Sequence, residues 1–173
     1  MAILLTTADF EAGEYQIAQT SEDTALLLTY INKHETSYIR RVLGRTLGDL
    51  FIANVSPGPA SGRYETIKNA FYEQDDSECV YESKGMKDIL MGIIYYFFVS
   101  ENQVRHTQSG VTIATAEVSS ILSPENAALK GDFAWNDAVS SIKAIQWYCG
   151  VEHAEDYEEY AGSWFKIKYS PLL

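Results

Sequence analysis

The chain has 173 residues, of which 46% are hydrophobic, so it can form one domain that buries about two thirds of the surface of the unfolded chain. Asp and Glu number 24 against 13 Lys and Arg, which gives a formal net charge of −11. Proteins that bind nucleic acid tightly usually carry clustered Lys and Arg, because these residues displace counterions from phosphates. The acidic balance therefore argues against tight, sequence-specific DNA binding, although DNA could pass near such a surface without adhering to it.

Two cysteines, Cys79 and Cys149, are too few for the disulfide framework of a small secreted domain. We expect free thiols, and the sequence leaves open whether the two ever meet. The first residues lack the basic start and the long apolar region of a signal peptide, which predicts a cytoplasmic chain. The longest apolar run, 89–99, is shorter than the roughly 20 residues that a helix needs to cross a bilayer, so we expect it in the protein core.

The N-terminal residues 1–20 mix Gly13 with polar positions and carry only a weak pattern. This favours an extended lead-in that could adhere to a neighbouring molecule. No internal repeat and no linker typical of a domain boundary follows, so residues 21–173 are expected to form a single helical domain.

The first helix is predicted to begin at Ser21, whose hydroxyl can cap free backbone N–H groups while the two acidic residues after it suit the positive helix end. Asn32 and Glu35 resemble a capping box, so a second helix could begin there or one helix could continue. Gly44 interrupts the helical pattern, which predicts a bend or the close approach of another backbone. Apolar residues at helical spacing are Tyr38, Ile39, Val42, Leu43, Leu47, Leu50 and Phe51, with Arg40, Arg41 and Arg45 on the remaining face.

Residues 56–62 are rich in proline and glycine and end this helical stretch. A short helix is predicted over 64–72, before the Asp-Asp-Ser sequence at 75–77 breaks it. A long helix is then predicted over 84–106, and it contains the apolar run. A helix that is apolar on every side must be surrounded by its own domain or by a neighbour.

The segment 107–122 is nearly uncharged and has a different periodicity. Within 110–115, alternation along the chain and a high content of β-branched residues favour a strand or a hairpin arm. Such a long excursion lacks partners within a compact monomer, so it suggests folding against another molecule.

The last helix is predicted to begin at Ser123 and Pro124, a capping hydroxyl followed by proline at the first helical position, and to run to about residue 152. Its expected inner face comprises Phe133, Val139, Ile142, Ile145, Gln146 and Cys149. Alternation over 164–169 then predicts a strand. The expected fold is mainly α: a small bundle of four to five helices with a β-prone arm over about 107–122 and a short C-terminal strand.

Candidate reactive residues give no complete site. Cys149 and His153 could share a helix face as half of a metal site, but no second pair has metal-ligand spacing, so we expect a core cysteine and a surface histidine. Ser140 and Lys143 match Ser-x-x-Lys, yet the companion motifs of that catalytic class are absent. These two residues are expected on a solvated helix face.

The remaining histidines, His34 and His106, have no Ser or Cys partner evident in the sequence and are expected near helix ends. An enzyme of unrecognised type would need a pocket with perturbed titratable groups, for which the sequence offers no positive evidence. We therefore assign no catalytic residue, no metal ligand and no cofactor, and do not expect an enzyme.

Three patterns occur in order along residues 21–150. The first is Tyr-Ile-Arg-Arg-Val-Leu-Gly at 38–44, which continues to Leu47 and Phe51. The second is the aromatic-rich helix opened by Gly85, and the third is Thr-Gln-Ser-Gly-Val at 107–111 with Glu-Val-Ser-Ser further on. Together they resemble the head-to-tail connector proteins of tailed bacteriophages, the adaptor or head-completion group. The motifs are packing patterns without a catalytic signature.

The resemblance implies a helical bundle that assembles with copies of itself into a cyclic ring, usually twelvefold, beneath the portal protein. Such a ring lengthens the DNA channel without specific DNA binding and docks tail or neck proteins. It implies a virion protein at the head-tail interface, present in the host cytoplasm during assembly, with no cofactor and no membrane contact.

In this family the loop between the two long helices and the terminal segments commonly reach adjacent subunits. They correspond here to 107–122 and 162–173, so strand addition to a neighbour is expected. The residues expected at a subunit or partner interface are Gln108, Ser109, Gly110, Val111, Thr112, Ile113, Glu117, Val118, Trp164, Phe165, Ile167 and Tyr169.

A different class of function also fits the acidic composition: a monomeric helical protein that mimics DNA and so inhibits a DNA-binding protein. Carboxylates grouped on one exposed face would favour mimicry. An apolar side surface together with an extended arm would favour a ring.

Overall fold

The computed structural model describes residues 3–17, 21–55, 62–75, 77–102, 104–107, 110–113 and 124–168. These residues form the helices α1 (Ser21–Leu43), α2 (Arg45–Val55), α3 (Arg63–Lys68), α4 (Met86–Asn102) and α5 (Pro124–Trp147). The strands are β1 (Phe71–Gln74), β2 (Val80–Ser83), β3 (Val104–Thr107) and β4 (Gly110–Ile113). A 3-10 helix η1 (Thr7–Phe10) precedes α1, and a π-helical turn η2 (Tyr148–Glu152) follows α5. The prediction of a mainly helical bundle is confirmed.

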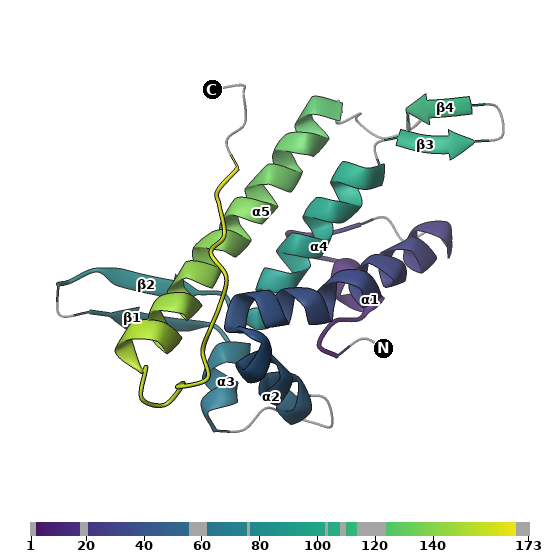
Figure 1. The fold of residues 1–173 in the computed structure, drawn as a ribbon. Helices are drawn as coiled ribbons and strands as arrows, with labels where there is room; N and C mark the ends of the chain where they lie inside the picture. Colours follow the sequence, from purple (N-terminus) through teal and green to yellow (C-terminus); the bar gives the residue numbers. More distant parts are fainter. Residues whose placement is uncertain are drawn as a thin grey trace.

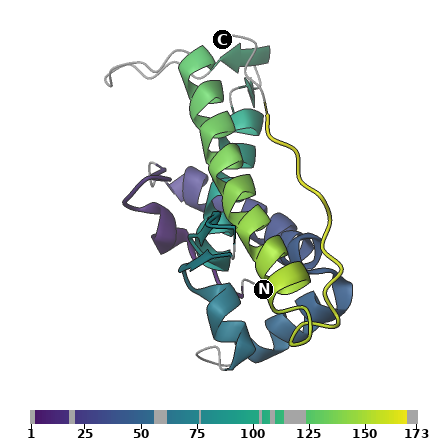
Figure 2. The same cartoon turned by 90° about the vertical axis from the view of Figure 1, so that its left-hand side faces the viewer.

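Helices α4 and α5 lie side by side and antiparallel, and α1 packs across α4 (Figure 1). Helices α2 and α3 follow at one end of this pair, and the antiparallel β1–β2 hairpin packs on α5. The C-terminal residues run as an extended chain along α5, visible in yellow in both ribbon views (Figure 2). Within the described residues, no helix is long and apolar enough to cross a membrane.

Helix α1 is continuous from Ser21, so the restart considered at Asn32 does not occur. Gly44 ends it with a φ of 85°, a left-handed conformation that glycine adopts without steric cost, and α2 then continues in a new direction. A Cβ atom at this position would lie 2.7 Å from the backbone nitrogen of Ala161. Both alternatives proposed for Gly44, a bend and a close backbone approach, are therefore correct.

The apolar run lies in the core on α4, as predicted. The fully buried side chains of this helix are Met86, Ile89, Leu90, Ile93 and Ile94. Towards its C-terminal end, Phe97 packs against the rings of His34, Tyr38 and Trp135, which come from α1 and α5. The aromatic end of α4 thus joins three helices in one cluster.

The N-terminal residues 3–17 fold onto the same chain, which differs from the extended lead-in expected. Glu35 of α1 is 1% exposed, and its carboxylate accepts hydrogen bonds from the backbone N–H groups of Ile3, Leu4 and Leu5 at 2.7, 2.6 and 2.9 Å. A buried carboxylate needs such donors because desolvation is otherwise costly. The segment buries Leu5, Phe10, Tyr15 and Ile17.

Two helices end earlier than predicted, because the residues that follow them pair as β-strands. The helix expected over 64–72 ends at Lys68, and β1 pairs with β2 instead. The helix expected over 84–106 ends at Asn102, and β3 pairs with β4 as a hairpin. His106 consequently lies in a strand, whereas the strand predicted within 110–115 is confirmed as β4. Aromatic residues in β1 and β-branched residues in β3 and β4 favour this pleated conformation over a helix end.

Helix α5 begins at Pro124, as predicted, but its inner face is shifted from the expected one. Phe133 is 67% exposed, whereas Ala134 and Trp135 next to it are buried. The remaining inner residues Val139, Ile142, Ile145 and Cys149 are buried as expected, and Gln146 is half-buried. The predicted C-terminal strand is wrong over its described part, since residues 160–168 are extended without a strand partner.

Candidate interaction surface

Residues 160–168, here named the C-terminal segment, are held against the end of α1. The Ala161 N–H donates to the carbonyl of Leu43 at 3.2 Å, and the Ser163 N–H donates to the carbonyl of Arg41 at 2.7 Å. The last carbonyls of a helix have no partner within the helix, so an adjacent extended chain can satisfy them. The position of the segment therefore follows from where α1 ends.

Side chains of α5 fix the far end of the same segment. The Trp135 indole N–H donates to the carbonyl of Lys166 at 2.9 Å. The Asn136 amide donates to the carbonyl of Lys168 at 2.9 Å and accepts from its N–H at 2.7 Å. An asparagine that binds both backbone groups of one residue replaces the strand neighbour that the segment lacks.

Gly162 lies between the two hydrogen-bonded residues of the segment, directly against the end of α1. A Cβ atom there would overlap the carbonyl oxygen of Val42 and the ring of Tyr160. Only glycine fits this position, so the backbone of the segment lies directly on the helix.

The side chains of the segment alternate between two hollows, as in any extended chain. Ala161 and Ser163 line a groove on the α1 side, whereas Tyr160, Gly162 and Trp164 line a groove on the α5 side. The C-terminal segment is thus a ridge between two concave surfaces of different chemistry.

The groove on the α5 side, here named the aromatic groove, has a volume of about 470 Å³. Tyr81 stacks on Trp147 in its wall, with ring centroids 3.9 Å apart. Trp164 is 88% exposed and Val151 is 67% exposed at its margin. Burial raises the pKa of Tyr160 to about 12, so its hydroxyl remains a neutral hydrogen-bonding group. Exposed aromatic side chains beside a hollow are typical of protein contact sites.

The groove on the α1 side, here named the basic groove, has a volume of about 570 Å³. It contains four of the chain's 13 Lys and Arg residues, namely Lys33, Arg40, Arg41 and Arg45, beside the hydroxyls of Thr36, Ser37 and Ser163. The Arg40 side chain contacts Asp49 at 2.7 Å. The Arg41 guanidinium lies 4.7 Å from the ring centre of Tyr38 and 5.2 Å from that of Phe165. Such stacking fixes the orientation of the Arg41 guanidinium.

The predicted interface residues fall into four groups. Trp164 and Ile167 lie on the surface, whereas Phe165 is 7% exposed and packs inward against Tyr38 and Trp135. Phe165 therefore anchors the C-terminal segment within its own chain. Gly110, Val111, Thr112 and Ile113 form strand β4. Gln108, Ser109, Glu117, Val118 and Tyr169 lie outside the described residues.

Of the candidate metal pair, Cys149 lies in the core as expected, whereas His153 is only partly exposed. Cys149 is fully buried, and burial raises its pKa to about 12. His153 is half-buried and lies 3.5 Å from Glu73 and 3.9 Å from Asp156. No group of three His, Cys, Asp or Glu side chains in the described part of the chain could hold a metal ion.

The other candidate reactive residues also occupy structural positions. Ser140 and Lys143 are exposed on α5, as expected for a solvated face. His34 is buried in the middle of α1, so its placement near a helix end was wrong.

A cluster of charged groups joins the N-terminal segment to α4 and α5. Lys84 contacts Asp137 at 2.6 Å and Glu14 at 3.4 Å, and the Tyr15 hydroxyl donates to Asp137 at 3.0 Å. Burial, with the nearby carboxylates, raises the pKa of Asp88 beside them. These groups come from segments far apart in the sequence and contact one another, so the cluster helps to hold the N-terminal segment on the helices.

The walls of the two grooves were only partly visible in the sequence. The three arginines at 40, 41 and 45 stood out on one helix face. The aromatic groove carried no such signal, because Tyr81, Trp147 and Trp164 meet only through the packing of β2, α5 and the C-terminal segment.

A comparison with models of protein families finds no match to this chain, and comparisons with curated proteins and with solved structures find none either.

Proposed function

We propose that this protein is a structural component of a virus particle, a head-to-tail connector that forms a ring under the portal, extends the DNA channel and docks the tail. The observation that carries the proposal is the C-terminal segment, which is fixed to its own chain and presents Trp164 to solvent between two unlike grooves. The sequence patterns that resemble connectors supply the specific class.

The segment is suited to protein contact because its backbone is already ordered. Its hydrogen bonds to Leu43, Arg41 and Trp135 fix the chain before any partner arrives. A preformed surface loses little conformational entropy on binding, so more of the contact energy appears as affinity. An indole that is 88% exposed can then bury most of its surface in a partner.

A cyclic ring needs two different patches on each subunit, one facing each neighbour. The basic groove and the exposed acidic side chains of the β1–β2 hairpin and its turn, Glu78 and Glu82, are unlike in charge. The β3–β4 hairpin extends from the end of α4 beyond the helices (Figure 1), where the arm was expected. These features support assembly in a ring.

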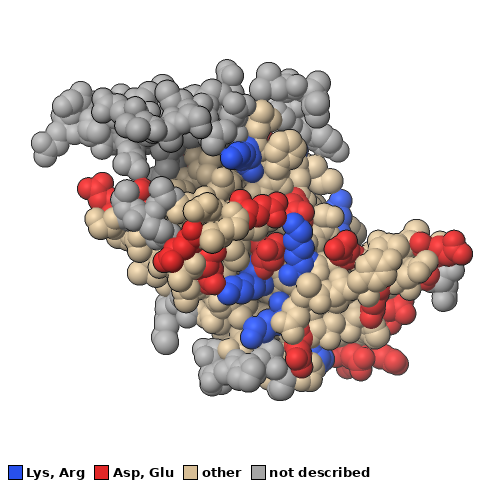
Figure 3. Space-filling view, turned by 180° about the vertical axis from the view of Figure 1, so that it is seen from behind, with Lys and Arg blue, Asp and Glu red and all other residues tan. Residues whose placement is uncertain are grey.

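The face of the molecule seen from behind disfavours DNA mimicry (Figure 3). Acidic residues gather on the projecting β1–β2 hairpin, but Lys and Arg are interspersed with acids over the neighbouring body (Figure 3). A mimic of the DNA backbone would instead present a continuous row of carboxylates.

Mass measurement of the purified full chain, alone and mixed with the portal protein of the same particle, tests the proposal. Native mass spectrometry should show a closed cyclic oligomer, and electron microscopy should show a ring with a central opening. A chain that stays monomeric at all concentrations and ignores the portal would contradict the connector proposal.

A further inference from the structure

The β1–β2 hairpin has one face packed on its own chain and one face open. Tyr81 stacks on Trp147 of α5, and Phe71 packs against Tyr148. The opposite face is exposed and comprises Tyr72, Gln74, Val80 and Glu82, which lie across from each other as Tyr72↔Glu82 and Gln74↔Val80. Tyr72 is 65% exposed and Val80 is 50% exposed. This outer face therefore offers apolar area beside an acidic group.

The turn of the hairpin is held in a defined shape and carries a further carboxylate. The Asp75 carboxylate accepts hydrogen bonds from the backbone N–H groups of Ser77 and Cys79 at 2.8 and 2.9 Å. Glu78, with a φ of 64°, is exposed at the tip. Among the described residues, neither Glu78 nor Glu82 has an ion-pair partner.

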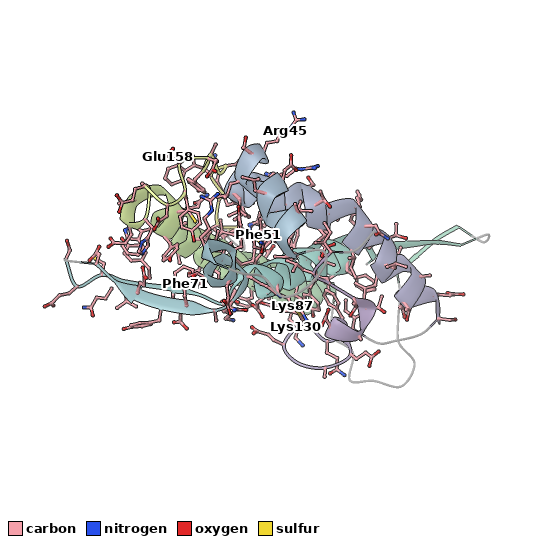
Figure 4. The ribbon with its side chains drawn as sticks, turned by 90° about the horizontal axis from the view of Figure 1, so that it is seen from below. Arg45, Phe51, Phe71, Lys87, Lys130 and Glu158 are labelled. Atoms are coloured by element: carbon pink, nitrogen blue, oxygen red, sulfur yellow. The ribbon has the colours of Figure 1, made fainter. Side chains whose placement is uncertain are left out.

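The basic groove has the complementary chemistry. Arg45 is exposed at the start of α2, points away from the body (Figure 4), and has no ion-pair partner within the described ranges. Arg41 is oriented by the rings of Tyr38 and Phe165 rather than by a carboxylate. A guanidinium that is not paired with a carboxylate of its own chain can bind one from a partner through two parallel hydrogen bonds.

The dimensions also agree. The groove follows α1 from Lys33 to Arg41, about 12 Å at the rise of an α-helix, and continues past the bend at Gly44 to Arg45. A four-residue strand such as β2 extends about 14 Å, and the turn adds to this length. The hairpin projects from the side of the body (Figure 1), so a neighbour can reach its outer face.

We propose that the basic groove of one copy of this protein receives the outer face of the β1–β2 hairpin of a second copy. Glu78 and Glu82 pair with Arg41 and Arg45, and Tyr72 packs beside Arg41. The hairpin cannot fill its own groove, since its inner face is already fixed on α5. The two patches differ, so the contact is head-to-tail and propagates from copy to copy. The inference rests on the proposed function, because it gives the subunit contact of the assembly.

A cross-linking experiment tests the contact directly. Cys79 is an exposed native thiol at the hairpin tip, whereas Cys149 is buried. The variant Ser37→Cys adds a thiol in the basic groove, and mild oxidation of the full chain should then give a ladder of disulfide-linked multimers on a non-reducing gel. The ladder should disappear when Cys79→Ser is added. Ser140→Cys, exposed on α5 outside the groove, is the matched control and should give no ladder.

Charge reversal provides the second test. Arg41→Glu with Arg45→Glu reverses the two cations that the contact uses in the groove, and Glu78→Lys with Glu82→Lys reverses the hairpin; all four positions are exposed. Each double variant alone should weaken assembly about tenfold or more, and an equimolar mixture should restore it, because the reversed groove now fits the reversed hairpin. Lys130→Glu with Lys166→Glu, an equal charge change outside the groove, should assemble like the unaltered chain.

The outcomes separate this inference from the proposed function. If the unaltered chain assembles and both reversals assemble equally well, the hairpin contact is refuted while the ring proposal stands. If the unaltered chain never assembles, both are refuted. If reversal of the groove abolishes binding to duplex DNA but leaves assembly intact, the occupant of the groove is a phosphate backbone and the inference is wrong.

Discussion

The imidazole of His34 lies flat against the phenyl ring of Phe97, with ring centroids 4.2 Å apart and the planes 2° from parallel. The histidine is 9% exposed, and its Nε2 atom has no hydrogen-bond partner among the described residues. Burial, and then the positive charge of Lys33, lower the pKa of His34, while Glu101 partly opposes this. The core of α1 therefore holds a neutral histidine.

This arrangement predicts acid sensitivity. A histidine with a lowered pKa in the folded state takes up its proton first in the unfolded chain, as the pH falls below about 6.5. The free energy of unfolding should therefore decrease below that pH, by about 1.4 kcal/mol for each unit of lowering. Urea denaturation at pH 7.5 and 5.5 measures it. His34→Phe keeps a ring stacked on Phe97 but cannot be protonated, so it should reduce the decrease in the free energy of unfolding between pH 7.5 and 5.5. An equal decrease in this variant would show that other groups cause it.

Glu35 predicts a second effect, at the N-terminal segment. Glu35→Ala removes the acceptor of three backbone N–H groups and should lower the free energy of unfolding by about 1–3 kcal/mol or more. Hydrogen exchange at residues 3–5 should accelerate, because these amides lose their partner. Asn32→Ala, exposed on the same helix, is the control and should change neither quantity. Equal exchange in the two variants would mean that the hydrophobic side chains alone hold the segment.

Glycine substitutions provide a third test, with opposite signs expected. Gly162→Ala and Gly44→Ala place a Cβ atom against backbone atoms, so both should lower the melting temperature. Gly131 in α5 has its nearest neighbour atom at 3.5 Å, an ordinary contact. Gly131→Ala should therefore be neutral or stabilise by up to about 1 kcal/mol, as expected within a helix. Differential scanning calorimetry distinguishes these outcomes, and a stable Gly162→Ala would show that the segment can move off α1.

Much of the helical framework could be predicted because its signals are local. The helix start at Ser21, the interruption at Gly44 and the proline at 124 depend on residues that are close in the chain, and the structure confirms all three positions. The apolar run identified the core helix for the same reason, since hydrophobic side chains on every face require burial.

The sequence-based predictions are wrong where contacts with residues far apart in the sequence determine the local structure. Phe71 reads as helical by spacing, yet β1 pairs with β2 and the ring packs on Tyr148. Phe133 has the character of a core residue, but the rotation of α5 against α4 turns it to solvent. The C-terminal segment is extended, as its alternating sequence predicts. Its hydrogen-bond partners are the end of α1 and side chains of α5 rather than another strand.

Only part of the candidate interaction surface could be predicted, because some of its residues meet only through contacts distant in the sequence. The resemblance to connector proteins implies that Trp164 lies at an interface, and the structure puts this residue on the surface. The basic groove was visible as arginines on one helix face. The aromatic groove was not, because no pattern along the chain relates Tyr81 to Trp147.

Two adjacent aromatic residues of the C-terminal segment provide the last prediction, which separates folding from assembly. Phe165 is 7% exposed, so Phe165→Ala should cost about 3–5 kcal/mol and lower the melting temperature of the monomer. Trp164 is 88% exposed, so Trp164→Ala should leave the melting temperature of the monomer unchanged. If Trp164 contacts a partner, the same change should reduce binding by 2 kcal/mol or more, roughly 30-fold, because buried tryptophans dominate protein interfaces. Calorimetry of the monomer and native mass spectrometry of the assembly give the two readouts. Unchanged assembly in Trp164→Ala would remove the aromatic groove from the contact surface and leave the basic groove as the remaining candidate.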